Sequence, residues 1–215
     1  MNRPAKKPAR YSDILALPEN LVGEIVDGEL IVHPRPTGEH SQVQAELGSD
    51  LVFAFNRGRG GPGGWWIRPE IELHLGRDIL VPDLSGWRRT VMPDAPRGPF
   101  ITVAPQWICE VLSPRTALID RGRKLRKYAR HGVDHAWLID TTSKTVEVLR
   151  REAQKWVIVD VFGGDAKVRA EPFDAVESDL SVLWLPEVAT PAATEAPRAK
   201  QRRGKGSGKK PRPKL

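Results

Sequence analysis

The sequence predicts a mixed α/β fold around one central sheet flanked by helices, with extra β-hairpins. Apolar residues recur every fourth position over residues 39–56, which indicates one face of a helix. The nearly continuous apolar run 106–112 is typical of a central strand buried on both faces. Asp27-Gly28 lies between alternating apolar residues, a strong hairpin signal. A chain of 215 residues is long enough for one such domain with a sizeable core.

The other elements follow in chain order, and Gly or Pro bounds most of them. Before the central strand we expect a short helix (11–17), a hairpin (23–32) and the long helix (39–56). A glycine-rich loop (57–64), two strands joined by a turn (66–75 and 79–86) and a proline-rich loop (91–105) follow. After the central strand we expect a helix (119–130) that Gly132 ends and a buried strand (135–140). A second hairpin (145–149 and 156–162) and a short β-rich remainder up to residue 185 complete the domain.

The formal net charge of +7 comes from the two ends of the chain. Residues 198–215 carry nine Lys or Arg and residues 1–10 carry four, with no acidic residue in either range, so the body between them is acidic. This division predicts a disordered basic N-terminus over 1–10, a folded domain over 11–186 and a disordered basic tail over 187–215. A flexible polycation is expected to bind DNA backbones in a salt-sensitive way, or only to keep the protein soluble.

The composition excludes several classes of protein. No apolar run approaches the roughly 20 residues that span a bilayer. No apolar stretch follows the basic N-terminus, so it does not resemble a signal peptide. The single cysteine, Cys109, excludes an internal disulfide and fits a reducing compartment. We therefore expect a soluble cytoplasmic protein with no membrane contact.

Charged residues stand at unexpected places in the predicted elements. Glu110 lies inside the buried run WICEVL, and a buried carboxylate needs a metal, a lysine or an arginine beside it. Asp83 follows Val81-Pro82 at a strand end and is a second such carboxylate. Lys124 shares a face of the next helix with residues 120 and 128, because the spacing is four. Cys109 alternates with Glu110, so it is interpreted as a core residue rather than a nucleophile.

Two carboxylates from neighbouring strands and one lysine suit phosphodiester hydrolysis. The carboxylate oxygens can hold Mg²⁺, which prefers hard oxygen ligands and keeps several waters. The metal polarises a phosphoryl oxygen and supplies an activated water, and the lysine can orient that water or stabilise charge in the transition state.

The segments GEIVDGELIV, LVPDLSGW, WICEVLSPRT, DRGRKLRKYARHGV and AWLID, in this order, resemble the Uma-type family of bacterial proteins. That family is described as restriction endonucleases with the PD-(D/E)XK fold, so a restriction-endonuclease-like sheet and a Mg²⁺- or Mn²⁺-dependent endodeoxyribonuclease are implied over residues 11–186. The resemblance assigns Asp83, Glu110 and Lys124 to the site, and makes Glu24 a further acidic residue near the metal. The usual lysine position is Leu112 here, and Lys124 takes its place. Many nucleases of this fold act as homodimers.

Each candidate also has an ordinary structural explanation. Asp83 could form a turn after proline, Glu110 could pair with Lys124 or an arginine, Lys124 could be a solvated helix residue, and Glu24 could be an exposed hairpin residue. Asp120 fits the N-cap of its helix. His40 could reach a phosphate, but a lone histidine at a helix start is more often a surface residue. Tyr128 and Trp137 are interpreted as core residues, and the pair Trp65 and Trp66 as core or base-stacking residues. Arg88, Arg89 and Arg97 could line a path for phosphates.

Three functions remain open from the residues themselves. The first is the metal-dependent DNA endonuclease. The second is a catalytically inactive nuclease-fold protein that binds nucleic acid or a protein partner, and it stays open because Leu112 occupies the usual lysine position. The third is a hydrolase of another phosphoester. A metal titration distinguishes the second from the first, and a panel of substrates distinguishes the third.

Overall fold

The computed structural model describes residues 7–36 and 38–186. The predicted tail 187–215 and the first six residues of the predicted N-terminus lie outside the described residues. Residues 7–10 lie inside them, and the Ala9 N–H donates a hydrogen bond to the Gly28 carbonyl at 2.8 Å. Within the described ranges no helix is both long enough and apolar enough to cross a bilayer.

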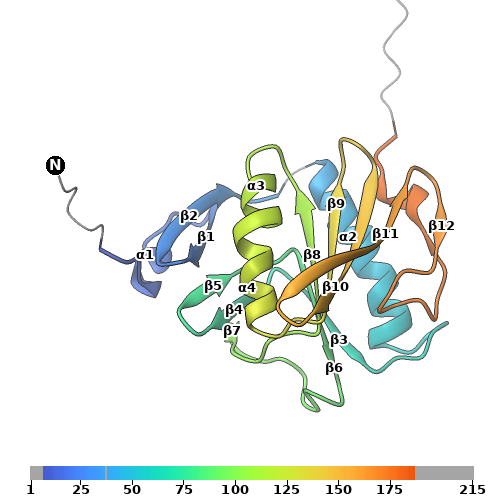
Figure 1. The fold of residues 1–215 in the computed structure, drawn as a ribbon, viewed down its shortest axis with the longest axis horizontal. Coiled ribbons are helices and arrows are strands. Elements are labelled where there is room, and N and C mark those ends of the chain that lie inside the picture. The colour runs from blue at the N-terminus through green and yellow to red at the C-terminus, as the bar shows by residue number, and fades with distance from the viewer. Residues whose placement is uncertain (1–6, 37, 187–215) are drawn as a thin grey trace, which may run out of the picture. The chain divides into compact units, whose positions relative to one another are not determined.

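The described chain consists mainly of strands, with α2 (Glu39–Leu51) as its longest helix (Figure 1). The helices are α1 (Tyr11–Leu15), α2 (Glu39–Leu51), α3 (Ala117–Ile119), α4 (Leu125–Arg130) and a final 3₁₀ helix (Leu180–Leu183). The strands are β1 (Leu21–Val26), β2 (Glu29–Pro34), β3 (Trp65–Pro69), β4 (Glu72–Leu75), β5 (Asp78–Leu80), β6 (Leu84–Arg88), β7 (Phe100–Ile101), β8 (Trp107–Leu112), β9 (His135–Asp140), β10 (Thr145–Glu152), β11 (Lys155–Gly163), β12 (Lys167–Val168) and β13 (Ser178–Asp179).

The described strands form a six-stranded mixed sheet, which is the predicted central sheet, together with a second sheet of five strands and a small pair. One sheet has the order β11-β10-β9-β8-β6-β3 and the other β2-β1-β5-β4-β7, while β12 pairs with β13. The expected strands 66–75 and 79–86 each break in two and pass from one sheet to the other. The breaks fall at Glu70, whose φ is +42°, and at Pro82, which has no N–H for a sheet ladder. Asp83 therefore lies where the chain enters the six-stranded sheet.

Strand β8 lies inside the six-stranded sheet, and every one of its residues is buried, as predicted. It runs antiparallel to β6 and parallel to β9. Cys109 pairs with Leu84, so the next residue on β8, Glu110, comes level with Asp83 just before β6. Cys109 belongs to the core on one face of the sheet and the neighbours of Glu110, Ile108 and Leu112, to the core on the other. The predicted alternation is confirmed.

Helices cover both faces of this sheet. Helix α2 buries Val43, Leu47 and Leu51 in one core, as its four-residue spacing predicts, and continues as a π-helical turn over Val52–Asn56. Helix α4 packs on the opposite core and follows α3 through a π-helical turn over residues 120–124. The observed start at Ala117 makes Thr116 the N-cap residue. The N-cap prediction for Asp120 is therefore wrong, whereas Gly132, with φ of +84°, follows the helix end as predicted.

Candidate functional site

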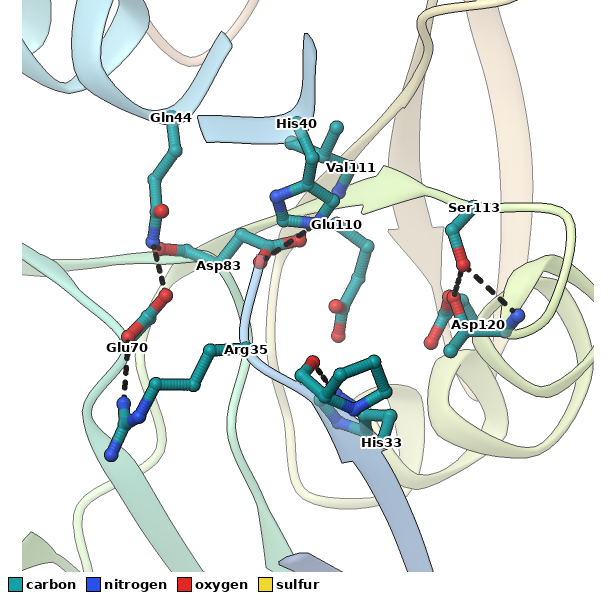
Figure 2. A network of polar contacts seen from close by, with 12 residues as sticks. His33, Arg35, His40, Gln44, Glu70, Asp83, Glu110, Val111, Ser113 and Asp120 are labelled. Atoms are coloured by element: carbon teal, nitrogen blue, oxygen red, sulfur yellow. Dashed lines mark hydrogen bonds and ion pairs between the residues drawn. The ribbon is translucent and has the colours of Figure 1, made fainter. Parts of the chain in front are cut away.

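Asp83 and Glu110 line one pocket of about 360 Å³, together with Asp120 and Lys124. The Val111 N–H donates to Asp83 Oδ2 at 2.6 Å, which ties the chain before β6 to strand β8. Figure 2 shows both side chains at this junction. The structure thus brings together the two carboxylates that the sequence predicted from separate segments.

Lys124 is buried among carboxylates. Its Nζ lies 2.9 Å from Glu110 Oε1, 3.0 Å from Glu24 Oε1 and 3.4 Å from Asp120 Oδ1. The side chain is 3% exposed, so it is not a solvated helix lysine. Tyr128 lies on the same helical face, and its hydroxyl donates to Glu110 Oε1 at 2.6 Å. The predicted face of residues 120, 124 and 128 therefore looks back at strand β8.

The single ammonium of Lys124 faces three carboxylates, which is more negative charge than it can balance. Burial raises the pKa of Glu110 well above its ordinary value; Lys124 opposes the rise, and Asp120, Asp83 and Glu24 add to it. Burial also raises the pKa of Asp120 against the effect of Lys124. Burial would lower the pKa of Lys124, but the carboxylates outweigh it and raise the pKa well above normal. The cluster keeps Lys124 charged and favours a proton on Glu110.

Glu24 lies on β1 and contacts Lys124. It is 2% exposed, so it is not an exposed hairpin residue, and it does not line the pocket. Its Oε1 accepts a hydrogen bond from the Val81 N–H at 2.7 Å, and its Oε2 lies 3.5 Å from His33 Nε2. Burial alone would raise the pKa of Glu24, but Lys124, His33 and the Val81 N–H lower it on balance. Glu24 holds both the lysine and the segment that leads to Asp83.

His40 is a site residue that the sequence interpretation missed. Its Nε2 lies 3.3 Å from Asp83 Oδ1, and the side chain is 20% exposed and lines the pocket. Burial lowers the pKa of His40, but the bond to Asp83 and the neighbouring acidic charges raise it on balance. The sequence feature that could have predicted this role is the cluster of His33, Arg35 and His40 between the first hairpin and the long helix.

The arginines after Asp83 lie elsewhere. Arg88 is the last residue of β6 and Arg89 follows it, and neither lines the pocket. The Arg89 guanidinium lies 3.9 Å from the ring centre of Trp66 and donates to the Asn56 carbonyl at 2.5 Å. Trp65 is buried in the core. The tryptophan pair therefore serves packing, as the plainer interpretation expected, and these arginines lie away from the acidic pocket.

We expect Tyr128→Phe to destabilise the fold by about 1–3 kcal/mol, because Glu110 loses a buried donor that no water replaces. The same change should raise the pKa of Glu110 further. Urea unfolding of both proteins at neutral pH measures the first effect. A free energy of unfolding equal to that of the wild type would show that the hydroxyl contributes no net stability.

The carboxylate oxygens of the pocket suit a hard divalent cation, although they do not surround one common position. No group of three or more His, Cys, Asp or Glu in the described chain is arranged to hold a metal ion. Mg²⁺ nevertheless needs only one or two carboxylates and keeps waters, and the pocket offers Asp83 and Glu110 with an excess of negative charge. The ion would compete with His40 for Asp83 and with Lys124 for Glu110.

The described chain thus has a mixed sheet covered by helices, with two carboxylates on adjoining segments and a buried lysine beside Glu110, and this fold is the restriction-endonuclease-like fold that the resemblance implies. Residues 11–182 match the family model described as "Uma2: Putative restriction endonuclease", and the chain belongs to this family. A crystal structure of "a putative nuclease belonging to DUF820" from Anabaena variabilis ATCC 29413 is similar, with a TM-score of 0.67 and 27% identity, over 82% of this chain and 98% of that one. No curated protein matches the chain. The resemblance and the fold class are confirmed, and a nuclease function in general is supported.

Proposed function

We propose that this protein is a metal-dependent endonuclease that hydrolyses phosphodiester bonds of DNA. The observation that carries the proposal is the shared pocket of Asp83 and Glu110 with a buried, charged Lys124 beside them. Buried charges of this kind are costly to the fold, and they gather at functional sites.

Asp83 and Glu110 would hold Mg²⁺ or Mn²⁺. When bound, the ion supplies a polarised phosphoryl oxygen and an activated water. The Val111 N–H fixes the orientation of Asp83, and Tyr128 fixes that of Glu110. Lys124 stabilises negative charge that develops on the phosphate, because its ammonium stays charged beside Glu110. Arg35 and Arg115 line the same pocket and supply positive charge for the substrate backbone.

Glu24 completes the proposed site, and two roles for it can be separated. The contacts of the Glu24 oxygens with Lys124, Val81 and His33 support a positioning role. The predicted metal-binding role requires that one of these three contacts breaks, so that an oxygen becomes available to the metal. We expect Glu24→Gln to lower kcat at saturating metal if it positions Lys124. A weaker apparent affinity for Mn²⁺ with kcat restored at high metal would instead identify a ligand.

The direct test is cleavage of plasmid and single-stranded DNA with Mg²⁺ or Mn²⁺ by the full chain, by Asp83→Asn and by a chain ending at residue 190. We expect metal-dependent nicking that Asp83→Asn abolishes and the shortened chain retains, with weaker DNA binding at low salt. If no metal supports cleavage and DNA binding persists, the inactive nuclease-fold alternative replaces the enzyme. Hydrolysis of other phosphoesters but not of DNA would favour the third candidate.

The pH dependence of metal binding should follow two raised pKa values. The proton on Glu110 and the proton that pairs His40 with Asp83 must both leave before the carboxylates accept a metal. Apparent Mn²⁺ affinity should therefore rise as pH rises above the ordinary His value of about 6.5. Conversely, the His40–Asp83 pair stabilises the metal-free fold below that value and loses this effect as pH rises through the raised pKa. Calorimetric titration at several pH values tests this, and His40→Gln should flatten the dependence.

We also propose a cytoplasmic location and a homodimer. The single buried Cys109 suits a reducing compartment, and a double-strand cut needs two active sites. Light scattering during size-exclusion chromatography measures the oligomeric state. A monomer that nicks but does not linearise plasmid would contradict the dimer proposal.

A further inference from the structure

A second pocket, of about 610 Å³, lies beside the acidic one and is called the α2 groove here. It runs between helix α2 and strand β3, and the residues used below are Gln44, Gly48, Phe53, Arg57, Ile67 and Glu70. Figure 2 shows Gln44 and Glu70 on one side of Asp83, with Glu110 and Asp120 on the other. Nothing in the proposed catalytic chemistry uses this groove.

Asp83 forms the wall between the groove and the acidic pocket. The Gln44 amide donates to the Asp83 carbonyl at 3.1 Å and to Glu70 Oε1 at 3.2 Å. Asp83 lines the acidic pocket, and the next residue, Leu84, lines the groove. A ligand that lies in both pockets would therefore pass directly over Asp83.

The helix wall of the groove is low because its residues are small. Gly48 lies inside α2, where glycine is less favourable than alanine, and an added Cβ would meet Leu84 Cδ2 at 3.4 Å. Ile67 and Leu84 line the opposite side. The result is a slot lined by both apolar and polar groups, in the volume range of small-ligand sites.

An aromatic ring and a cation stand at the end of the slot. Phe53 is 50% exposed, unusual for a ring beside a core helix. The backbone turns sharply after Phe53, where the Arg59 N–H donates to the Phe53 carbonyl at 2.9 Å. The Arg57 side chain is exposed and makes no hydrogen bond or ion pair with any described residue. An open aromatic face next to an uncommitted arginine is the arrangement by which proteins bind single-stranded DNA.

We propose that the α2 groove binds an unpaired nucleotide of single-stranded DNA adjacent to the phosphodiester bond held at Asp83. The base stacks on Phe53 and the phosphate contacts Arg57. The inference rests on the proposed nuclease function for the position of the bond, but not for the binding itself. A base that remains paired in a duplex cannot enter the slot, so the groove favours single strands, frayed ends or flipped nucleotides.

Binding without cleavage tests the groove. Fluorescence anisotropy of labelled oligothymidine is measured in EDTA with the full chain, at raised salt so that the basic tail contributes little. The comparison probes are the same strand with abasic sites, which keeps the phosphates, and a duplex. The proteins are wild type, Phe53→Ala, Phe53→Trp, and Ile158→Ala, which changes an exposed apolar residue on the far edge strand β11.

We expect Phe53→Ala to weaken binding of oligothymidine about tenfold or more, and to leave abasic and duplex binding within about twofold. Phe53→Trp should keep the affinity, and Ile158→Ala should match the wild type. Equal affinity of wild type and Phe53→Ala for oligothymidine, or an equal loss with the abasic strand, would overturn the proposal. The binding assay contains no metal, so its result does not depend on cleavage. If binding depends on the base but the protein cleaves nothing when metal is added, the groove proposal holds and the nuclease proposal fails. Metal-dependent cleavage with binding that does not depend on Phe53 rejects the groove alone.

Discussion

Glu110→Gln should lower metal-dependent cleavage at least about 100-fold without weakening the fold. The carboxylate is one of two proposed metal ligands, and an amide oxygen binds a hard cation less strongly than a charged oxygen does. The raised pKa of Glu110 shows that its charged form is unfavourable among Asp120, Asp83 and Glu24. Replacement by a neutral side chain of the same shape removes that repulsion, so the free energy of unfolding should stay level or increase.

Initial rates and thermal unfolding of the same protein preparation measure the two effects together. Glu152→Gln is the matched control, since Glu152 is exposed on β10 and far along the sheet from Asp83. Cleavage within about tenfold of the wild type would remove Glu110 from the proposed chemistry. A large loss of stability would mean that Glu110 acts as a structural ion-pair partner of Lys124, which is its ordinary alternative.

Lys124→Met should produce the largest loss of stability in this protein, about 3–5 kcal/mol at neutral pH. Methionine fills a similar volume but leaves Glu24, Glu110 and Asp120 buried without their common cation. Removing one partner of a buried ion pair costs more than the pair itself contributes, because the remaining charge stays desolvated. Cleavage should be lost as well, since the proposed transition-state cation is absent.

The destabilisation should shrink as the pH falls. Without Lys124 the pKa of Glu110 rises further above its unfolded value, so the folded state takes up a proton more readily than the unfolded state does. Stability is then regained as the pH falls through the raised pKa of Glu110 towards the pKa of the unfolded state. Urea unfolding at neutral and mildly acidic pH tests this, with exposed Lys155→Met as control. A loss that is independent of pH would indicate a packing defect instead of unbalanced charge.

Local patterns determined most of the elements. The hairpin around Asp27-Gly28 and helix α2 follow from residues that are near one another in the chain, and so does the buried strand β8. The candidate residues of the acidic pocket could also be predicted from patterns within single elements. A carboxylate inside an apolar run has to be compensated, and a four-residue helical spacing points Lys124 to the same side as Tyr128.

The contacts between distant segments were decided only in the tertiary structure. The split into two sheets depends on Pro82 and on the conformation of Glu70, and a continuous apolar pattern does not record either break. His40 reaches Asp83 across more than forty positions, and Glu24 reaches Lys124 across a hundred. The α2 groove likewise combines a helix face with an edge strand and a loop. Sequence periodicity reports which side of its own element a residue occupies, whereas these features depend on which elements meet, and that is set by packing of the whole core.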